Sequence, residues 1–351
     1  MATSLTSVLI IYTGGTIGMA QNPVTGALEP FNFHHLLDNV PELRLLGSSI
    51  STIQFEPPID SSEIEPSQWA RLVSLISENY DLFDGFVVLH GTDTMAYTAS
   101  AVSFMLENLS KPVIFTGSQL PIGVLRTDGK ENLITAIEIA SAKYPDGRPI
   151  VPEVCIFFEN SLMRGNRTSK ISAENFNAFA SPNYPLLAQV GVHISYDESE
   201  IRRPDDTLPL KAHFLMDTNI AVLKLYPGIS RQAVHQILNI PGLKGVVMET
   251  FGAGNAPKCE WFLSELRTAI QRGIVIVNVT QCNSGSVQMG LYSTGNTLLG
   301  CGVLSGYDST TEAAIAKLMF LFGHGLSPKE VAAAMNRSFV GEITIPDKDS
   351  L

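Results

Sequence analysis

The sequence predicts an α/β protein with two doubly wound α/β domains, a larger N-terminal one and a smaller C-terminal one. Its length of 351 residues is too great for one small core and suits two such domains. Short apolar runs rich in β-branched residues alternate with helical patterns, which is typical of parallel sheets covered by helices on both faces. The alternation stops between residues 196 and 217 and then resumes, which predicts a boundary between two domains.

The N-terminal domain is predicted over residues 1–195. Four apolar runs without polar alternation indicate buried strands at Val8–Tyr12, Gly85–Leu89, Pro112–Thr116 and Val154–Phe158. Helical patterns between them occupy Ser67–Asn79, Thr94–Leu109 and Asn132–Ala142. Because alternating strands and helices build parallel sheets, we expect these strands to form one sheet with their carboxyl ends at the same edge.

Residues 196–217 are predicted to link the domains, because charges cluster there with Pro204 and Pro209 and no period is visible. A second α/β domain is expected over residues 218–351. Its predicted strands are Ile220–Leu225, Gly245–Thr250 and Val275–Val279, and its predicted helices are Ser230–Leu238, Lys258–Arg272 and Thr310–Leu321.

Composition and charge exclude several classes of protein. Hydrophobic residues make up 45% of the chain and charged residues 16%, which indicates a globular protein and not a disordered one. The formal net charge of -11 repels phosphate backbones, so we expect no nucleic-acid partner. No apolar stretch reaches the roughly 18–20 residues that a membrane span needs, so we expect no membrane association.

Cysteine and histidine usage favours a cytoplasmic protein without a metal. The four cysteines are scattered, with no CxxC spacing, which suggests reduced thiols. The N-terminal residues lack the positive charge of a signal peptide, and the apolar run after them is only strand length. The seven histidines form no HExxH pair, so we expect neither a structural nor a catalytic metal.

The first motif that can carry chemistry is Thr13-Gly14-Gly15-Thr16-Ile17-Gly18, directly after the first strand. Ligands of open α/β sheets bind beyond the carboxyl ends of strands, and a glycine pair there lets backbone N–H groups approach a ligand closely. The spacing matches neither a P-loop nor a dinucleotide fingerprint, so no cofactor is expected. The motif fits a site that presents the hydroxyls of Thr13 and Thr16, and equally an ordinary turn with capping threonines.

The second motif, His90-Gly91-Thr92-Asp93-Thr94, repeats this arrangement after the strand Gly85–Leu89. Taken alone, it reads as N-capping of the next helix by Asp93 or Thr94. Two Gly-Thr turns after parallel strands of one sheet instead predict that Thr16 and Thr92 meet at the same edge. We interpret His90 as a structural histidine, because no order of nucleophile, histidine and acid is visible.

The third motif is Arg164-Gly165-Asn166-Arg167-Thr168-Ser169-Lys170, which follows the strand Val154–Phe158 after a short loop. Such a run is usually a solvated basic loop. Its position after a strand of the same sheet favours a site instead. A buried lysine beside hydroxyls and an aspartate is a plausible base, because lysine shifts its pKa readily on burial.

Taken together, these motifs resemble the bacterial-type asparaginase/glutaminase family. Thr13–Gly18 and His90–Thr94 look like its two signature regions, and the stretches RGNRTSK, LYPGI and FGAGNAP are similar to its cytoplasmic type I branch. The resemblance implies a two-domain α/β fold, hydrolysis of L-asparagine to L-aspartate and ammonia, and sites built in pairs across a homodimer that often associates into a homotetramer.

The resemblance also implies roles for individual residues. The matching catalytic residues are Thr16 as nucleophile, Thr92 with its supporting Asp93 and Lys170, and Tyr292 as a candidate for the phenol that activates Thr16. The matching substrate-binding residues are Gly15 and Gly91 in the two turns, Asp60 and Ser61 for the α-amino and α-carboxyl groups, Ser118 for the side-chain amide, and Asn255 from the neighbouring protomer.

The chain departs from the family pattern at two places. Many members carry a tyrosine in the loop after the first motif, whereas Gln21–Pro30 contains none, so Tyr292 takes its place in our assignment. Some type I enzymes are activated by asparagine at a second site that uses an arginine where this chain has Glu249. Ser169 and Cys282 match that site, but the reversed charge predicts that the regulation is lost.

Other functions remain possible from the sequence. A glutaminase or a mixed asparaginase-glutaminase differs only by one methylene of substrate, worth about 1–3 kcal/mol in pocket fit. A transfer-RNA amidotransferase subunit would carry a further N-terminal domain, and we expect none. A non-enzymatic amino-acid sensor would have a degenerate site, which the intact Thr16, Thr92, Asp93 and Lys170 argue against. The segment Gly252–Pro257 follows a strand and could suggest nucleotide binding, but it lacks the third glycine of the dinucleotide-binding fingerprint.

Overall fold

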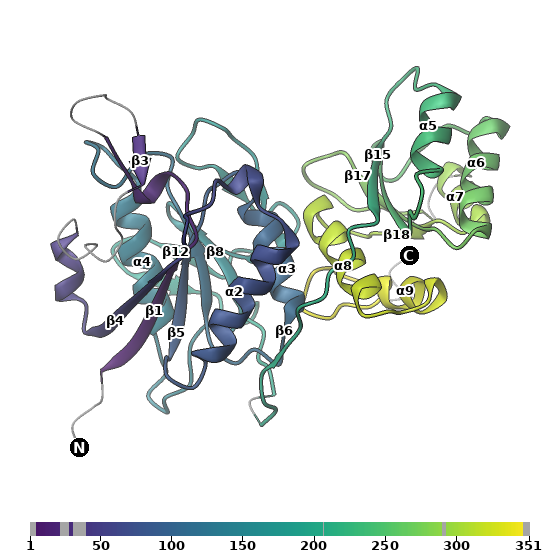
Figure 1. Cartoon of the computed structure of the whole chain (residues 1–351). Helices are drawn as coiled ribbons and strands as arrows, with labels where there is room; N and C mark the ends of the chain where they lie inside the picture. Colours follow the sequence, from purple (N-terminus) through teal and green to yellow (C-terminus); the bar gives the residue numbers. More distant parts are fainter. Residues whose placement is uncertain (1–4, 22–27, 31–39, 206, 290–292, 347–351) are drawn as a thin grey trace. The chain divides into compact units, whose positions relative to one another are not determined.

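The structure, a computed structural model, describes residues 5–21, 28–30, 40–205, 207–289 and 293–346. The chain divides into two compact units, Met1–Phe214 and Leu215–Leu351 (Figure 1). Each unit is built on a sheet with helices against it, and the N-terminal unit is the larger, as the predicted fold class requires. The expected linker lies mostly in the first unit, where Ile194–Tyr196 and Lys211–Ala212 are strands.

Among the described residues, an eight-stranded sheet forms the centre of the first unit, in the order β13-β12-β9-β8-β7-β5-β1-β4. Its strands are β1 Thr6–Tyr12, β4 Ser48–Gln54, β5 Gly85–Leu89, β7 Val113–Thr116, β8 Val154–Phe158, β9 Ser161–Arg164, β12 Ala188–Val190 and β13 Ile194–Tyr196. Strands β4, β1, β5, β7 and β8 run parallel to one another, whereas the pairings of β9, β12 and β13 are antiparallel.

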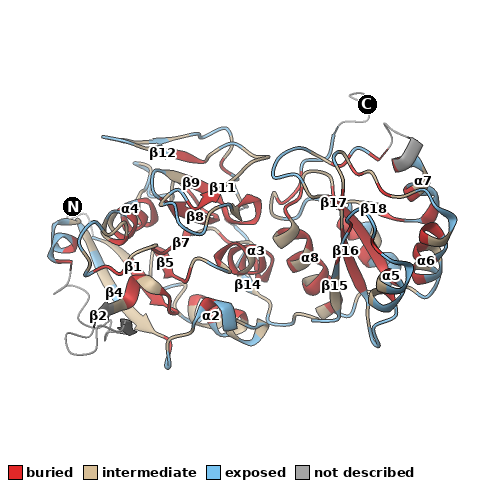
Figure 2. Cartoon of the chain, turned by 90° about the horizontal axis from the view of Figure 1, so that it is seen from above, coloured by how far each residue is buried: buried red, intermediate tan, exposed pale blue. Residues whose placement is uncertain are grey.

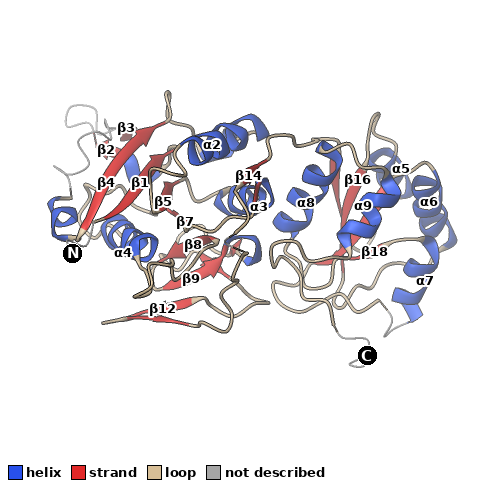
Figure 3. Ribbon diagram, turned by 90° about the horizontal axis from the view of Figure 1, so that it is seen from below, coloured by secondary structure: helices blue, strands red, loops and turns tan. Residues whose placement is uncertain are grey.

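Helices cover both faces of this sheet (Figure 3). They are α2 Pro66–Glu78, α3 Met95–Met105 and α4 Gly129–Ser141, with 3₁₀ turns η1 Thr16–Gly18, η3 Pro41–Leu45, η4 Ser61–Glu63 and η5 Gly165–Arg167. Short strand pairs complete the unit: β2 Met19–Gln21 with β3 Leu28–Pro30, β6 Leu106–Glu107 with β14 Lys211–Ala212, and β10 Ser169–Lys170 with β11 Phe179–Ala180.

Strand periodicity determines which side chains meet which helix. Alternate residues of β1, namely Val8, Ile10 and Tyr12, belong to one buried cluster with the inner side of α4. The intervening Leu9 and Ile11 are equally buried on the opposite face of the sheet. Because both faces are covered, the central strands read as continuous apolar runs, which is why the sequence revealed them.

The second unit contains a parallel sheet in the order β15-β16-β17-β18. Its elements are β15 Ile220–Lys224, α5 Arg231–Leu238, β16 Gly245–Thr250, α6 Glu260–Gln271, β17 Val275–Thr280, α7 Ser293–Cys301, β18 Leu304–Ser305, α8 Thr311–Gly323 and α9 Pro328–Met335. One face of the sheet shares a buried cluster with α5, α6 and α7, and the other shares one with α8 and α9. Figure 2 colours the buried residues red, and they lie along the strands of both sheets and on the helices.

Most predicted elements are present, and their ends differ for identifiable reasons. Strands Gly85–Leu89, Val154–Phe158 and Gly245–Thr250 are confirmed residue for residue. The helices expected at Ser230 and Thr310 begin one residue later, because these side chains are N-caps that accept from the backbone N–H three residues on. The helix expected to continue to Leu109 ends at Met105, where the chain turns into β6.

Several elements escaped prediction. Strand β4 lies at the sheet edge and is only half-buried, so its sequence is polar and lacks the apolar run of a central strand. Strands β9, β12 and β13 form an antiparallel extension of the sheet, and β12 and β13 are only three residues long. Strands this short carry too little periodicity to be recognised from one sequence.

A buried ion pair joins α8 to the segment that follows α9. The Nζ atom of Lys317 lies 2.6 Å from Oε1 of Glu342, and both side chains are only 1% exposed. Lys317 also donates to the carbonyl oxygens of Met335 and Arg337, while Glu342 accepts from the backbone N–H groups of residues 339 and 340. Each charge is therefore compensated within the protein, as burial requires.

We predict that Lys317→Met destabilises the protein by about 3–5 kcal/mol, because Glu342 would remain buried without its partner. Urea unfolding monitored by circular dichroism measures this change. The double variant Lys317→Met/Glu342→Leu should recover much of the loss. The matched control is Lys211→Met, which breaks the exposed pair with Glu107 and should change stability by less than about 1 kcal/mol. Equal effects of the two single variants would contradict this account.

Candidate active site

Two glycine turns meet at the carboxyl edge of the first sheet. Strands β1 and β5 pair in parallel with Tyr12 opposite Leu89, so the turns that follow them start at the same level. A Cβ atom on Gly15, whose φ is +92°, would lie only 2.5 Å from Cα of Gly91. A Cβ on Gly91 would lie 2.4 Å from Oγ of Ser61. Only glycine permits this approach, so the two turns contact each other backbone to backbone.

The peptides at the two turns offer hydrogen-bond donors. Within the part of the chain that the structure describes, the backbone N–H groups of Thr16 and Thr92 donate to no acceptor. The same residues provide no partner for the hydroxyl of Thr16, which is partly exposed at the start of η1. The turn regions that the sequence singled out therefore hold a hydroxyl and two N–H groups that a ligand can engage.

The second turn carries a hydrogen-bonded trio. The Nζ atom of Lys170 lies 2.9 Å from Oγ1 of Thr92 and 2.6 Å from Oδ1 of Asp93. The ammonium side chain is 19% exposed, whereas the Asp93 side chain is 64% exposed. The structure thus brings together three of the residues assigned from sequence, although Lys170 lies 77 positions along the chain from Asp93.

The basic run before Lys170 is not a solvated loop. Arg164 is buried and makes two hydrogen bonds to the carboxylate of Glu153, with Nε 2.6 Å from Oε2. The guanidinium groups of Arg164 and Arg167 both lie over the ring of Tyr184. The turn η5, which contains Arg167, packs against α3, and the chain then enters β10, which carries Lys170.

Gln119 also contacts the trio, and the sequence analysis assigned it no role. Its Oε1 lies 3.4 Å from Oγ1 of Thr92, which donates to it, and its Nε2 donates to the carbonyl oxygens of Ala173 and Asn175. It therefore connects Thr92 to the loop after β10. Gln119 is the third residue after β7, so it also lies beyond a strand end, where ligands of open α/β sheets bind.

Asp60 and Ser61 lie beside the two turns because the residue before them, Ile59, is hydrogen-bonded to the turn that follows β1. The N–H of Ile59 donates to the carbonyl oxygen of Thr13 at 2.8 Å, and the buried Ser61 abuts Gly91. The carboxylate of Asp60 is exposed, and the N–H and hydroxyl of Ser62 hydrogen-bond to it, which lowers the pKa of Asp60. The carboxylate therefore stays ionised at neutral pH and can attract an ammonium group.

Ser118 lies in the loop after β7. Its hydroxyl donates to the carbonyl oxygen of Leu120 at 2.5 Å, so the side chain is engaged within the loop. The carboxylate of Asp128 accepts the N–H groups of Gln119 and Leu120 and holds the loop in shape. The backbone contact to the substrate amide that the resemblance implies for Ser118 stays a prediction.

His90 is buried and forms no ion pair with any residue that the structure describes. Its Nδ1 lies 2.7 Å from the carbonyl oxygen of Gly91 and its Nε2 lies 3.0 Å from Oγ1 of Thr98. Burial lowers the pKa of His90 to about 4, so the ring is neutral at neutral pH. These partners fit the structural interpretation given above for this histidine.

Two assigned residues belong to the second unit. Asn255 closes a turn after β16, where its N–H donates to the carbonyl oxygen of Phe251 at 2.8 Å. Tyr292 lies outside the described residues, as do positions 22–27 of the loop after the first motif. Glu249 is engaged on two sides: its carboxylate lies 3.1 Å from Nζ of Lys224 and accepts from the hydroxyl of Thr311.

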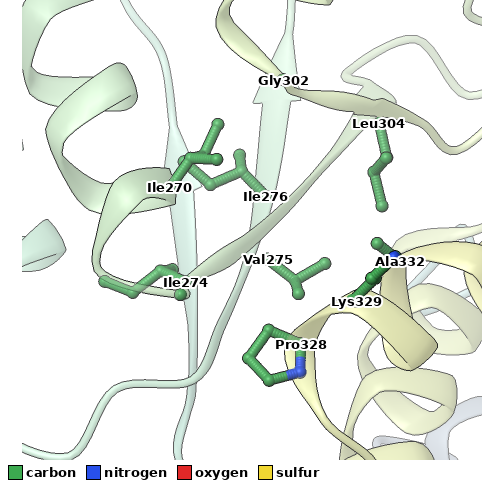
Figure 4. A pocket seen from close by; sticks show the side chains of 10 residues that line it. Ile270, Ile274, Val275, Ile276, Gly302, Leu304, Pro328, Lys329 and Ala332 are labelled. Carbon is green, nitrogen blue, oxygen red and sulfur yellow. The ribbon is translucent and has the colours of Figure 1, made fainter.

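A pocket in the second unit offers no comparable chemistry (Figure 4). It lies at the amino ends of β17 and β18, whereas ligands of parallel sheets bind at carboxyl ends. Its lining is apolar apart from Lys329 and includes no carboxylate or hydroxyl. Among the described residues we find no helix able to cross a membrane, and no cluster of three or more His, Cys, Asp or Glu side chains placed to hold a metal ion.

Comparison with known proteins agrees with this geometry. A family model described as "Asparaginase, N-terminal" matches residues 7–202, and one described as "Glutaminase/Asparaginase C-terminal domain" matches residues 219–335. L-asparaginase 1 of Escherichia coli is 45% identical over 97% of this chain and 99% of its own length. The 60 kDa lysophospholipase of Homo sapiens is 42% identical over 96% of this chain, which corresponds to 61% of that protein.

A solved structure supports the same conclusion. L-asparaginase I of Vibrio cholerae superposes with a TM-score of 0.88 and 42% sequence identity, covering 97% of this chain and all of that one. The similarity therefore includes both units, with the sheet edge that carries the two Gly-Thr turns. By sequence and by fold, the chain belongs to the glutaminase/asparaginase family.

Proposed function

We propose that this protein hydrolyses L-asparagine to L-aspartate and ammonia with Thr16 as the nucleophile. The observation that carries the proposal is the hydrogen-bonded trio of Thr92, Lys170 and Asp93 on the turn that contacts the Thr16 turn. A hydroxyl, a lysine held by a carboxylate and unpaired backbone N–H groups are the groups that amide hydrolysis needs. Relatives of this chain named L-asparaginase add support.

In the proposed course, the Thr16 hydroxyl attacks the side-chain carbonyl carbon of asparagine. Ammonia leaves, and water then hydrolyses the β-aspartyl ester on Thr16. Lys170, in its neutral form, accepts a proton through Thr92, while Asp93 holds the lysine side chain. The N–H groups of the turns stabilise the oxyanion, which contributes about 3–4 kcal/mol per donor. We assign the phenol of Tyr292 to the activation of Thr16.

Substrate recognition follows from the charges at the sheet edge. The ionised Asp60 binds the α-amino group, and Ser61 binds the α-carboxyl group. Gly15, Gly91 and the backbone of Ser118 contact the side-chain amide. Asn255 of a neighbouring protomer completes the pocket, so we propose a homodimer or homotetramer. The four free cysteines favour the cytoplasm.

Glutamine is the alternative substrate, because one methylene changes pocket fit by only about 1–3 kcal/mol. Ammonia release from asparagine and glutamine, measured in parallel with the purified enzyme, tests the proposal. We expect the higher kcat/KM with asparagine. A preference for glutamine would assign the protein to the glutaminase alternative, and no release from either amide would reject amide hydrolysis.

We predict that Thr16→Ala and Thr92→Ala each lower kcat at least about 1,000-fold, since each removes a hydroxyl that acts with the reacting atoms. Steady-state ammonia release measures kcat, and circular dichroism checks the fold. The matched control is Thr207→Ala, an exposed threonine that bonds only within its own loop, which should keep wild-type activity. Near-normal turnover in either active-site variant would contradict the proposed mechanism.

The second prediction concerns assembly. If Asn255 enters a neighbouring protomer's site, activity requires at least a dimer. We therefore expect Asn255→Ala to lower activity without dissociating the dimer. Sedimentation velocity across a dilution series, with activity measured on the same samples, checks both statements. A fully active monomer would contradict the shared site.

The third prediction concerns regulation. A carboxylate effector near Glu249 would meet a like charge that is already paired with Lys224 and Thr311, so binding there is disfavoured. We therefore expect a hyperbolic dependence of rate on asparagine, with a Hill coefficient of about one. Initial rates over a wide concentration range measure it. A clearly sigmoidal curve would mean that an activating site survives despite Glu249.

A further inference from the structure

The two Gly–Thr peptides of the site are each held from beneath by a buried aromatic side chain. The hydroxyl of Tyr12 donates to the carbonyl oxygen of Gly15 at 3.2 Å. Nδ1 of His90 lies 2.7 Å from the carbonyl oxygen of Gly91. Both aromatic side chains are almost completely buried. Each is hydrogen-bonded to the carbonyl of the peptide that precedes a proposed active-site threonine.

The direction of the hydrogen bonds at His90 follows from its partners. A carbonyl oxygen only accepts, so Nδ1 carries the proton and Nε2 is the acceptor for the hydroxyl of Thr98 at 3.0 Å. The oxygen of Thr98 in turn accepts from Nε1 of Trp69 at 3.0 Å. One chain of donors therefore runs from Trp69 through Thr98 and His90 to Gly91, and it fixes the tautomer of the ring.

Holding these carbonyl oxygens also orients the N–H groups on the other side. In a trans peptide, the carbonyl and the N–H of the next residue point in opposite directions. Because the oxygens of Gly15 and Gly91 are bound from the interior, the N–H groups of Thr16 and Thr92 point away from it. Among the described residues neither N–H has an acceptor, so both remain available at the sheet edge.

We propose that Tyr12 and His90 are positioning residues, which aim the N–H groups of Thr16 and Thr92 at the oxyanion that forms during amide hydrolysis. The proposal rests on the function proposed above and assigns the two aromatic residues a part in it. Neither touches the substrate. Each acts through one peptide plane, and Thr98 and Trp69 act through His90.

Burial keeps both groups in the required protonation state. The pKa of His90 falls to about 4 because the ring is desolvated, so at neutral pH it holds one proton and one acceptor nitrogen. Burial also raises the pKa of Tyr12, so its hydroxyl keeps the proton that it donates. The side chains of Tyr12 and His90 therefore do not change protonation state between about pH 6 and pH 9.

The test compares variants that remove one hydroxyl each; the hydroxyl of Thr98 bonds to both His90 and Trp69. Tyr12→Phe removes the side-chain donor to the carbonyl oxygen of Gly15, which keeps the backbone N–H of Gly18, and Thr98→Val removes the donor to Nε2 of His90. We expect each to lower kcat about tenfold or more with KM nearly unchanged, since misaimed N–H groups lose contact mainly in the transition state. Thr98→Ser keeps the hydroxyl and should restore most of kcat.

Tyr80→Phe is the matched control for Tyr12. The hydroxyl of Tyr80 is also partly buried in the first unit, where it bonds to Ser110, away from the turns. We expect this variant to keep wild-type kcat. If Tyr12→Phe and Thr98→Val also keep it, the positioning role is wrong. Thermal unfolding of each variant separates a loss of fold from a loss of rate.

A spectroscopic readout tests the geometry independently of activity. In the wild-type protein, long-range ¹H–¹⁵N correlation should show the His90 ring proton on Nδ1, and in Thr98→Val the ¹⁵N shift of Nε2 should change because this nitrogen loses its hydrogen-bond donor. A wild-type ring protonated on Nε2 would overturn the inference, even if a variant failed to fold. If wild-type protein releases no ammonia while the ring carries its proton on Nδ1, the proposed function is wrong. The hydrogen bond from His90 to the carbonyl oxygen of Gly91 is then still confirmed.

Discussion

Strands β1 and β5 pair in parallel and end level with each other, so that the backbones of Gly15 and Gly91 meet directly. The rest of the site depends on this contact. A side chain at Gly15 would force the turns apart, since its Cβ would lie 2.5 Å from Cα of Gly91, and a side chain at Gly91 would displace Ser61, whose Oγ would lie 2.4 Å from the new Cβ. The turns that carry Thr16 and Thr92 follow adjacent strands and contact each other. The segment from Ile59 to Ser61 packs against both turns.

Buried polar groups hold the parts of the site in place. Arg164 and Glu153 form a buried, doubly hydrogen-bonded pair that anchors the turn before Lys170. Tyr12 and His90 bind carbonyl oxygens of the two turns from the interior. Arg164, Glu153, Tyr12 and His90 each have a hydrogen-bond partner, as low dielectric surroundings demand. This rigidity suits catalysis by preorganised hydrogen bonds, because the donors need no rearrangement when charge develops.

The overall charge says little about this edge of the sheet. The chain is acidic, with a formal net charge of -11, yet the N–H groups of Thr16 and Thr92, which have no acceptor among the described residues, present partial positive charge at the edge where we propose that the oxyanion forms. Asp60 supplies the opposite sign nearby for an ammonium group. Local charges of both signs fit a zwitterionic amino acid better than a simple anion or cation.

The sequence by itself determined the class of fold, the central strands and the two Gly-Thr turns. Their signals are local: apolar runs for strands covered on both faces, and glycine followed by a hydroxyl at a strand end. It also pointed to the order of motifs that the family shares. The edge strand β4 and the short antiparallel strands gave no such signal, because half-exposed or three-residue strands lack a distinct period.

Only the tertiary structure decided which distant residues meet. The bond between Lys170 and Thr92 spans 78 positions, and the bond from Gln119 to Thr92 spans 27. Whether Arg164 was a solvated cation or a buried anchor depended on Glu153, which only the folded sheet brings within 2.6 Å. The direction of the bonds around His90 likewise required Thr98 and Trp69 on neighbouring helices. Hydrogen bonds and ion pairs act over a few ångströms, so their partners are set by packing and not by order along the chain.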